Sequence, residues 1–161
     1  MATVQEYLDG DDGQLGTDAE TPSAVAVTRL GPLRLVTFAG GRGFVTYRDL
    51  GGADGAVIAR WVEGALAHYG EDPEITRVEW KTRAHDRAPA LHDALVRNGF
   101  VPGEPESIMI GEAALLAVDV PLPKGIHLRR VTSEPDVRAL SAMQEEVFGG
   151  GFAQEMADAL L

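Results

Sequence analysis

The sequence predicts an α/β (α+β) protein with a mixed, mostly antiparallel sheet flanked by helices. Short runs rich in β-branched residues and separated by glycine turns fill residues 24–48. Helical periodicity follows at 54–69, 89–98 and 133–148, with one more strand-like run between the first two. The hydrophobic content of 45% and the charged content of 24% are ordinary for a globular chain of 161 residues.

The first elements form a small antiparallel meander. Residues 1–23 are acidic and carry three glycines and a proline, which predicts a flexible lead-in, apart from a short turn of helix around Val4–Leu8, and we assign it no chemistry. Ala24–Leu30 and Leu33–Phe38 are strand-like runs, and a glycine turn at 40–43 leads into a third strand at Phe44–Arg48.

A helix, a strand and a second helix follow the meander. Asp54 is a suitable N-cap for a helix that runs to Tyr69 with a continuous apolar face. Ile75–Thr82 is the next strand, and Pro89–Asn98 is a helix that ends at Asn98-Gly99 because a left-handed residue suits a helix C-terminus.

The remainder begins after a linker. Residues 118–125 hold two prolines and a glycine. A strand at Ile126–Val131 and a helix from the N-cap Ser133 to Phe148 are expected next, and glycines at 149–151 break this helix. Phe152, Met156 and Leu160 then repeat at helical spacing.

Charge and composition exclude several function classes. A formal net charge of −11 argues against non-specific nucleic-acid binding, which needs Lys and Arg at phosphates. The chain has no cysteine, no apolar run that could span a membrane and no metal-binding spacing of histidines, so we expect a cytoplasmic protein without a metal site. A basic cluster either attracts an anion or forms a solvated face with ion pairs; it comprises Arg77, Lys81, Arg83, Arg87 and Arg97.

The element order and the "VRNGF" that closes the second helix resemble the second half of the GNAT superfamily of N-acetyltransferases, over about residues 33–110. Residues 24–117 would then be one GNAT-like unit. Residues 126–161 look like the opening strand and helices of a second unit, as in tandem acetyltransferases, whose cofactor turn would lie beyond Leu161.

The resemblance implies a cofactor site in "RDLGGA", where the family pattern is matched by Arg48, Gly51 and Ala53 and extended by Gly52. In the family such a turn binds the pyrophosphate of acetyl-CoA through backbone N–H groups, and the acetyl group passes to a primary amine. The alternative is a plain strand-to-helix turn, because an Asp54 carboxylate that caps the helix would occupy the same donors and repel a phosphate.

The catalytic residues stay unknown. The family's general acid is often a tyrosine at the position held here by Leu95, which fits the apolar face of its helix. Glu79 is the nearest match to a general base, although strand alternation favours a solvated face for it. His85 lies in a loop where ligands gather, or else on an ordinary surface.

Two functions therefore remain open. One is a degenerate or truncated acetyl-CoA-dependent N-acetyltransferase, and the other is a non-catalytic binding or dimerisation module of the same fold. The apolar faces after residue 125 predict docking either on the chain's own sheet or in a swapped homodimer, and the abrupt apolar helices favour the homodimer.

Overall fold

The computed structural model describes residues 2–117, 119–149 and 151–161, so Val118 of the predicted linker and Gly150 of the predicted helix break lie outside the described residues. The chain divides into two compact units, Met1–Gly111 and Glu112–Leu161. The predicted linker over 118–125 falls within the second unit rather than between the two units.

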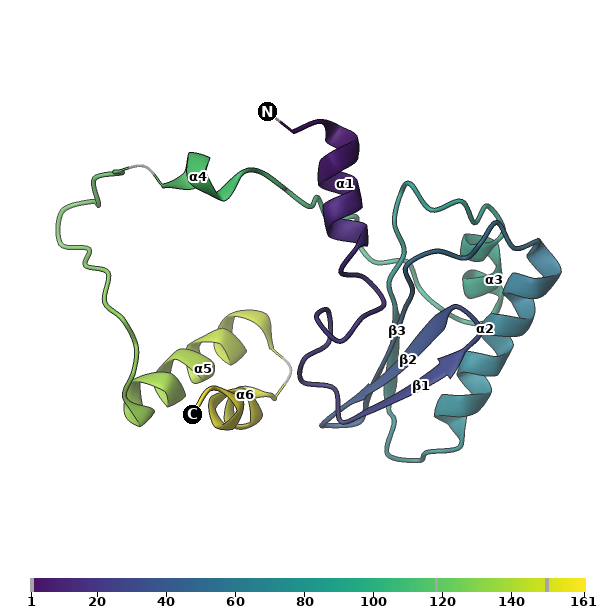
Figure 1. Cartoon of the computed structure of the whole chain (residues 1–161). Coiled ribbons are helices and arrows are strands. Elements are labelled where there is room, and N and C mark those ends of the chain that lie inside the picture. The colour runs from purple at the N-terminus through teal and green to yellow at the C-terminus, as the bar shows by residue number, and fades with distance from the viewer. Residues whose placement is uncertain (1, 118, 150) are drawn as a thin grey trace. The chain divides into compact units, whose positions relative to one another are not determined.

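The first unit is built on a four-stranded sheet in the order β1-β2-β3-β4 (Figure 1). Its strands are β1 (Ala26–Leu30), β2 (Leu33–Phe38), β3 (Arg42–Thr46) and β4 (Arg77–Trp80). The first three strands pair antiparallel, and β3 pairs parallel with β4, with Val45 opposite Trp80. The predicted mixed, mostly antiparallel sheet is confirmed.

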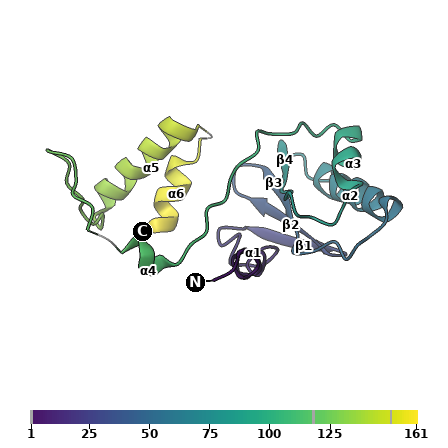
Figure 2. The same cartoon turned by 90° about the horizontal axis from the view of Figure 1, so that it is seen from above.

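The parallel pair is joined through helix α2 (Gly55–Gly70), and α3 (Leu91–Arg97) follows β4. Asp54 caps α2 as predicted, since its carboxylate accepts hydrogen bonds from the N–H groups of Ala56 and Val57. Both helices lie on the same face of the sheet in two perpendicular views (Figures 1 and 2).

The core lies between this face and the helices. Alternate strand residues such as Leu35 and Val45 are buried against the inward side of α2, which contributes Ile58 and Val62. Tyr69 closes one end of this core, and its hydroxyl donates to the backbone carbonyls of two strands, at Val36 and Phe44. Burial raises the pKa of Tyr69 to about 12 against the opposing effect of these hydrogen bonds.

The structure has a helix where a helical turn was predicted at Val4–Leu8, but it corrects the prediction that the rest of residues 1–23 is a flexible lead-in. Helix α1 (Val4–Asp12) opens this segment with a capping box between Thr3 and Glu6, and the following residues fold onto the second face of the sheet. Leu15 and Thr21 are buried there, and Glu20 accepts hydrogen bonds from Thr46 and Lys81. A sheet with helices on one face leaves its other face bare, and this segment covers it.

The second unit consists of helices. Its elements are α4 (Ala113–Leu116), α5 (Glu134–Phe148) and α6 (Ala153–Leu160), of which α5 and α6 pack on each other. Ser133 caps α5 as predicted, and Val137 is buried in the helix pair. The strand predicted at Ile126–Val131 is not formed, because no strand of this unit's described residues is available to pair with it.

Candidate functional site

A cavity of about 440 Å³ opens in the first unit at the end of the parallel strand pair. Three segments line it: the inner side of α1, the turn after β3 and the loop after β4. The lining residues are Gln5, Leu8, Asp12, Arg48, Asp49, Leu50, Arg83, His85, Asp86, Arg87 and Ala88. Because β3 and β4 are parallel, their carboxyl ends meet at one edge, where ligands of open α/β sheets bind. We call this cavity the polar cleft.

Arg83 organises the floor of the polar cleft. Its side chain is only 7% exposed, and its guanidinium contacts the carboxylate of Asp86 at 2.9 Å. The same group donates to the backbone carbonyls of Tyr47 and Arg48, at 3.2 and 3.0 Å. A guanidinium with this many partners is fixed in orientation, so the cleft has a rigid ion-paired centre.

Tyr47 supports this centre from below. Its hydroxyl donates a 2.6 Å hydrogen bond to Asp86, and its ring lies under the Arg83 guanidinium at 5.0 Å. Burial and the hydrogen bond to Asp86 raise the pKa of Tyr47 well above its ordinary value. Tyr47 therefore stays protonated and holds Asp86 in place.

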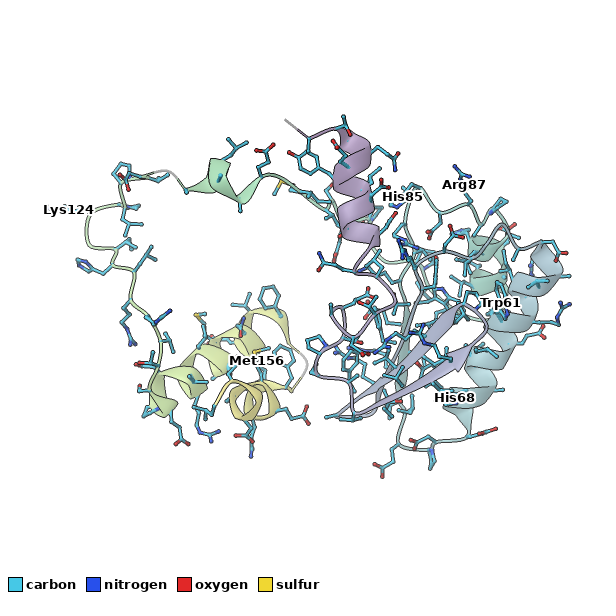
Figure 3. All side chains as sticks on the ribbon, viewed as in Figure 1. Trp61, His68, His85, Arg87, Lys124 and Met156 are labelled. Carbon is cyan, nitrogen blue, oxygen red and sulfur yellow. The ribbon has the colours of Figure 1, made fainter. Side chains whose placement is uncertain are left out.

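The carboxylate of Asp12, the last residue of α1, completes the cluster. One of its oxygens lies 3.1 Å from Nη1 of Arg83, and both lie 3.1 Å from Nε2 of His85. Figure 3 shows His85 beside the end of α1. Asp12 thus links the N-terminal helix to the loop after β4.

The predicted cofactor turn also borders the polar cleft, at Arg48. Gly51 and Gly52 have φ values of 65° and 67°, a left-handed conformation that glycine adopts without strain. The N–H of Gly51 donates to the carboxylate of Asp49, and the N–H of Ala53 donates to the carbonyl of Leu50. Two donors that a pyrophosphate would use are therefore already hydrogen-bonded.

The start of α2 is occupied in the same way. The Oδ1 atom of Asp54 accepts from the N–H groups of Ala56 and Val57 at 3.0 and 2.9 Å. This carboxylate sits where an anion at the helix N-terminus would bind, and it would repel one.

The other predicted site residues lie apart from one another. Leu95 is buried in the core, Glu79 is exposed on β4, and only His85 belongs to the polar cleft. In the basic cluster, Arg83 and Lys81 form ion pairs, with Asp12 and Glu20 among the acceptors. The predicted ion pairs are therefore present for these two residues, but the side chain of Arg83 is buried and does not lie on a solvated face.

Sequence reasoning missed Asp12 and Tyr47. Asp12 lies in a segment without a core pattern, and it reaches His85 across 73 positions, so no local spacing could reveal the contact. Arg83 stood out only as one member of a charged cluster. The burial of Arg83 depends on tertiary contacts with two segments distant in sequence, those of Asp12 and Tyr47.

Two kinds of feature are missing from the described part of the chain. No helix there has the length and apolar character needed to cross a bilayer. Nor do its histidine and carboxylate side chains form any group of three or more that could hold a metal ion.

No family model, no curated protein and no solved structure matches this chain.

Proposed function

We propose that the first unit is a non-catalytic binding module of GNAT-like topology that holds a small acidic molecule in the polar cleft. The observation that carries the proposal is a pair of free arginines, Arg48 and Arg87, on the lining of the cleft. Neither guanidinium is hydrogen-bonded or ion-paired with another described residue. The cleft volume of about 440 Å³ lies within the range of small-molecule sites, roughly 300–1,000 Å³.

The balance of charges favours an acidic ligand. The three carboxylates of the cleft, those of Asp12, Asp49 and Asp86, already accept hydrogen bonds from the protein. Two of its three arginines keep their donors available. A carboxylate or phosphate on the ligand would therefore find unpaired guanidinium donors and no unpaired carboxylate beside them.

Acetyl transfer is disfavoured because the backbone donors it needs are already hydrogen-bonded and the general-acid position holds an apolar residue. Asp49 and Asp54 occupy donors of the turn that a coenzyme pyrophosphate would need. Leu95 stands at the family's general-acid position and packs in the core. We therefore expect no productive acetyl-CoA complex.

The second candidate is acetyl-CoA-dependent acetyl transfer to a primary amine. It is favoured by the placement of Arg48 and the left-handed Gly51 and Gly52 at the carboxyl end of β3, directly before a helix N-terminus. In this case a conformational change of Asp54 would have to free the turn.

Calorimetry on the full chain distinguishes the candidates. We expect succinate to bind to the wild type, Arg48→Ala and Arg87→Ala each to weaken this binding, and the matched control Arg60→Ala on the exposed side of α2 to leave it unchanged. Saturating acetyl-CoA should give no thermal shift, although a ligand at 100 times its dissociation constant would add about 2.7 kcal/mol. A clear acetyl-CoA shift that Arg48→Glu abolishes would favour the transferase.

A further inference from the structure

Helix α1 is attached to the first unit through polar contacts. None of its side chains is buried, and its inner side, at Gln5 and Leu8, faces the polar cleft rather than a packed core. Its firmest described link to the rest of the unit is the carboxylate of Asp12, at 3.1 Å from both Arg83 and His85. Apart from the chain connection to the segment after Gly13, which is anchored on the sheet, α1 is held over the cleft by one acidic side chain.

The group that Asp12 contacts has the properties of an anion receptor. Arg83 is 93% buried by side-chain area and is fixed by Asp86 and by the carbonyls of Tyr47 and Arg48. The remaining guanidinium nitrogen, Nη1, donates to Asp12, next to Nε2 of His85. A carboxylate that contacts both groups is the arrangement expected for a bound acidic ligand.

We propose that Asp12 is an internal competitor, and that the ligand of the polar cleft is a small molecule whose carboxylate or phosphate replaces the Asp12 carboxylate on Arg83 and His85. This inference rests on the proposed function. It adds the two residues that recognise the acidic group, Arg83 and His85, and a way in which ligand binding is regulated by Asp12. When the ligand binds, α1 loses its link and is released from the cleft.

The exchange leaves no buried charge without a partner. With Asp12 removed, Arg83 keeps Asp86 and two backbone carbonyls, and the incoming anion takes the vacated donor. Release of α1 exposes no buried side chain of that helix. Arg48 and Arg87, on the same lining, would contact a second acidic or polar group of the ligand.

The first test compares Asp12→Asn with the matched control Asp11→Asn. Both remove one negative charge from adjacent positions of α1, but only Asp12 contacts Arg83 and His85. Calorimetric titrations of the full chain use succinate and inorganic phosphate as probes. We expect Asp12→Asn to bind one of them about tenfold more tightly than the wild type. In this variant no carboxylate at position 12 competes with the probe for Arg83 and His85. Asp11→Asn should match the wild type. The preferred probe identifies the acidic group as carboxylate or phosphate.

The second test needs no variant, and so stays decisive if Asp12→Asn fails to fold. In ¹⁵N-labelled wild type, saturation with the bound probe should accelerate amide exchange in α1 while the amides of α2 stay protected. Binding with unchanged exchange in α1, or with equal affinity for Asp12→Asn, would overturn the competitor while leaving the proposed function intact. Failure of both proteins to bind either probe would reject both proposals. Binding by Asp12→Asn alone would support the competitor.

Discussion

The carboxylate of Asp54 does two things at once at the start of α2. It satisfies the N–H groups of Ala56 and Val57, which have no partner within the helix, and it places a negative charge at the positive end of the helix dipole. Both effects stabilise α2. Both also oppose the binding of an anion at this point, so the same side chain stabilises the helix and disfavours an anion at its N-terminus.

Replacement of Asp54 by alanine separates these effects. Asp54→Ala should lower the free energy of unfolding by about 1 kcal/mol, as expected for a lost N-cap, and should increase any residual binding of inorganic phosphate. Urea denaturation measures the first effect and calorimetry the second. Glu63→Ala, on the exposed side of the same helix, should change stability by less than about 0.5 kcal/mol. Equal stability of Asp54→Ala and the wild type would show that the cap contributes nothing in solution.

At the scale of elements, the N-terminal segment is held on the sheet by Glu20. Burial alone would raise the pKa of Glu20, but hydrogen bonds from Lys81, Thr46 and the N–H of Gly16 outweigh it and hold the pKa below its ordinary value of 4.5. A carboxyl with a lowered pKa in the folded state stabilises the fold above its ordinary pKa, and this contribution is lost as the pH falls through the folded value.

The stability of Glu20→Gln should therefore depend on pH in a specific way. At pH 7 the free energy of unfolding of this variant should be about 1–2 kcal/mol lower than that of the wild type, because the variant loses charge-assisted hydrogen bonds. The difference should shrink as the pH drops below 4.5, when the wild-type carboxyl becomes protonated. Urea denaturation at several pH values measures it, with the exposed Glu71→Gln as control. A difference that stays constant from pH 7 to pH 3 would contradict the role assigned to the charge.

The contact between α2 and β3 depends on a glycine. A Cβ added at Gly43 would lie 2.8 Å from Cε1 of Tyr69, whose hydroxyl is anchored to two strand carbonyls. We expect Gly43→Ala to cost about 1–3 kcal/mol of stability, as is typical of overpacked cores. Gly70→Ala is the control, since a Cβ there meets no atom within 4 Å and alanine favours a helix. Thermal unfolding compares the two, and equal melting temperatures would show that Tyr69 moves aside freely.

The elements that sequence reasoning predicted well are those fixed by local signals. Strand β2 has the predicted bounds Leu33–Phe38, and the N-caps Asp54 and Ser133 start the predicted helices. Residues 13–23 and 126–131 were not predicted correctly, because their conformations depend on distant partners. The first segment packs on an otherwise uncovered sheet face, and the second lacks a strand to pair with.

The candidate site shows the same limit. Arg48 could be placed at the carboxyl end of a strand by its motif, and His85 by its position in a loop after a strand. The contact of Asp12 with Arg83 joins residues 71 positions apart. This contact forms only when the N-terminal segment packs across the sheet. No periodicity in the sequence predicts that packing.

At the scale of the whole molecule, the second unit exposes several large apolar side chains. Val137 and Ala157 are buried in the α5–α6 pair, whereas Met143, Val147 and Phe148 are exposed. Exposed apolar groups of this kind are typical of association surfaces. A swapped homodimer, or docking within one chain, stays the prediction for this unit.

Light scattering at micromolar concentration tests the homodimer. We expect the wild type to be dimeric and Val147→Ser/Phe148→Ser to be monomeric, because burial of each apolar side chain contributes roughly 1.5–3 kcal/mol. Glu146→Ser, a polar exposed neighbour, should remain dimeric. A wild-type monomer in which the amides of α6 exchange freely would contradict both forms of docking. A monomer with those amides protected would leave only docking within one chain.

The parallel pairing of β3 with β4 has a consequence for the order of folding. The β1–β2 turn brings together neighbours such as Leu30 and Leu33, whereas β3 meets β4 only after α2 has formed, as at Val45 and Trp80. Closing longer loops costs more entropy and slows folding. We therefore expect refolding to build the hairpins and α2 first and to seat β4, and with it the polar cleft, last. In stopped-flow refolding of a Trp61→Phe variant, which keeps Trp80 as its tryptophan, far-ultraviolet circular dichroism should recover before the fluorescence, and simultaneous recovery of both signals would contradict this order. A nascent chain would then have its secondary structure before it could hold any ligand.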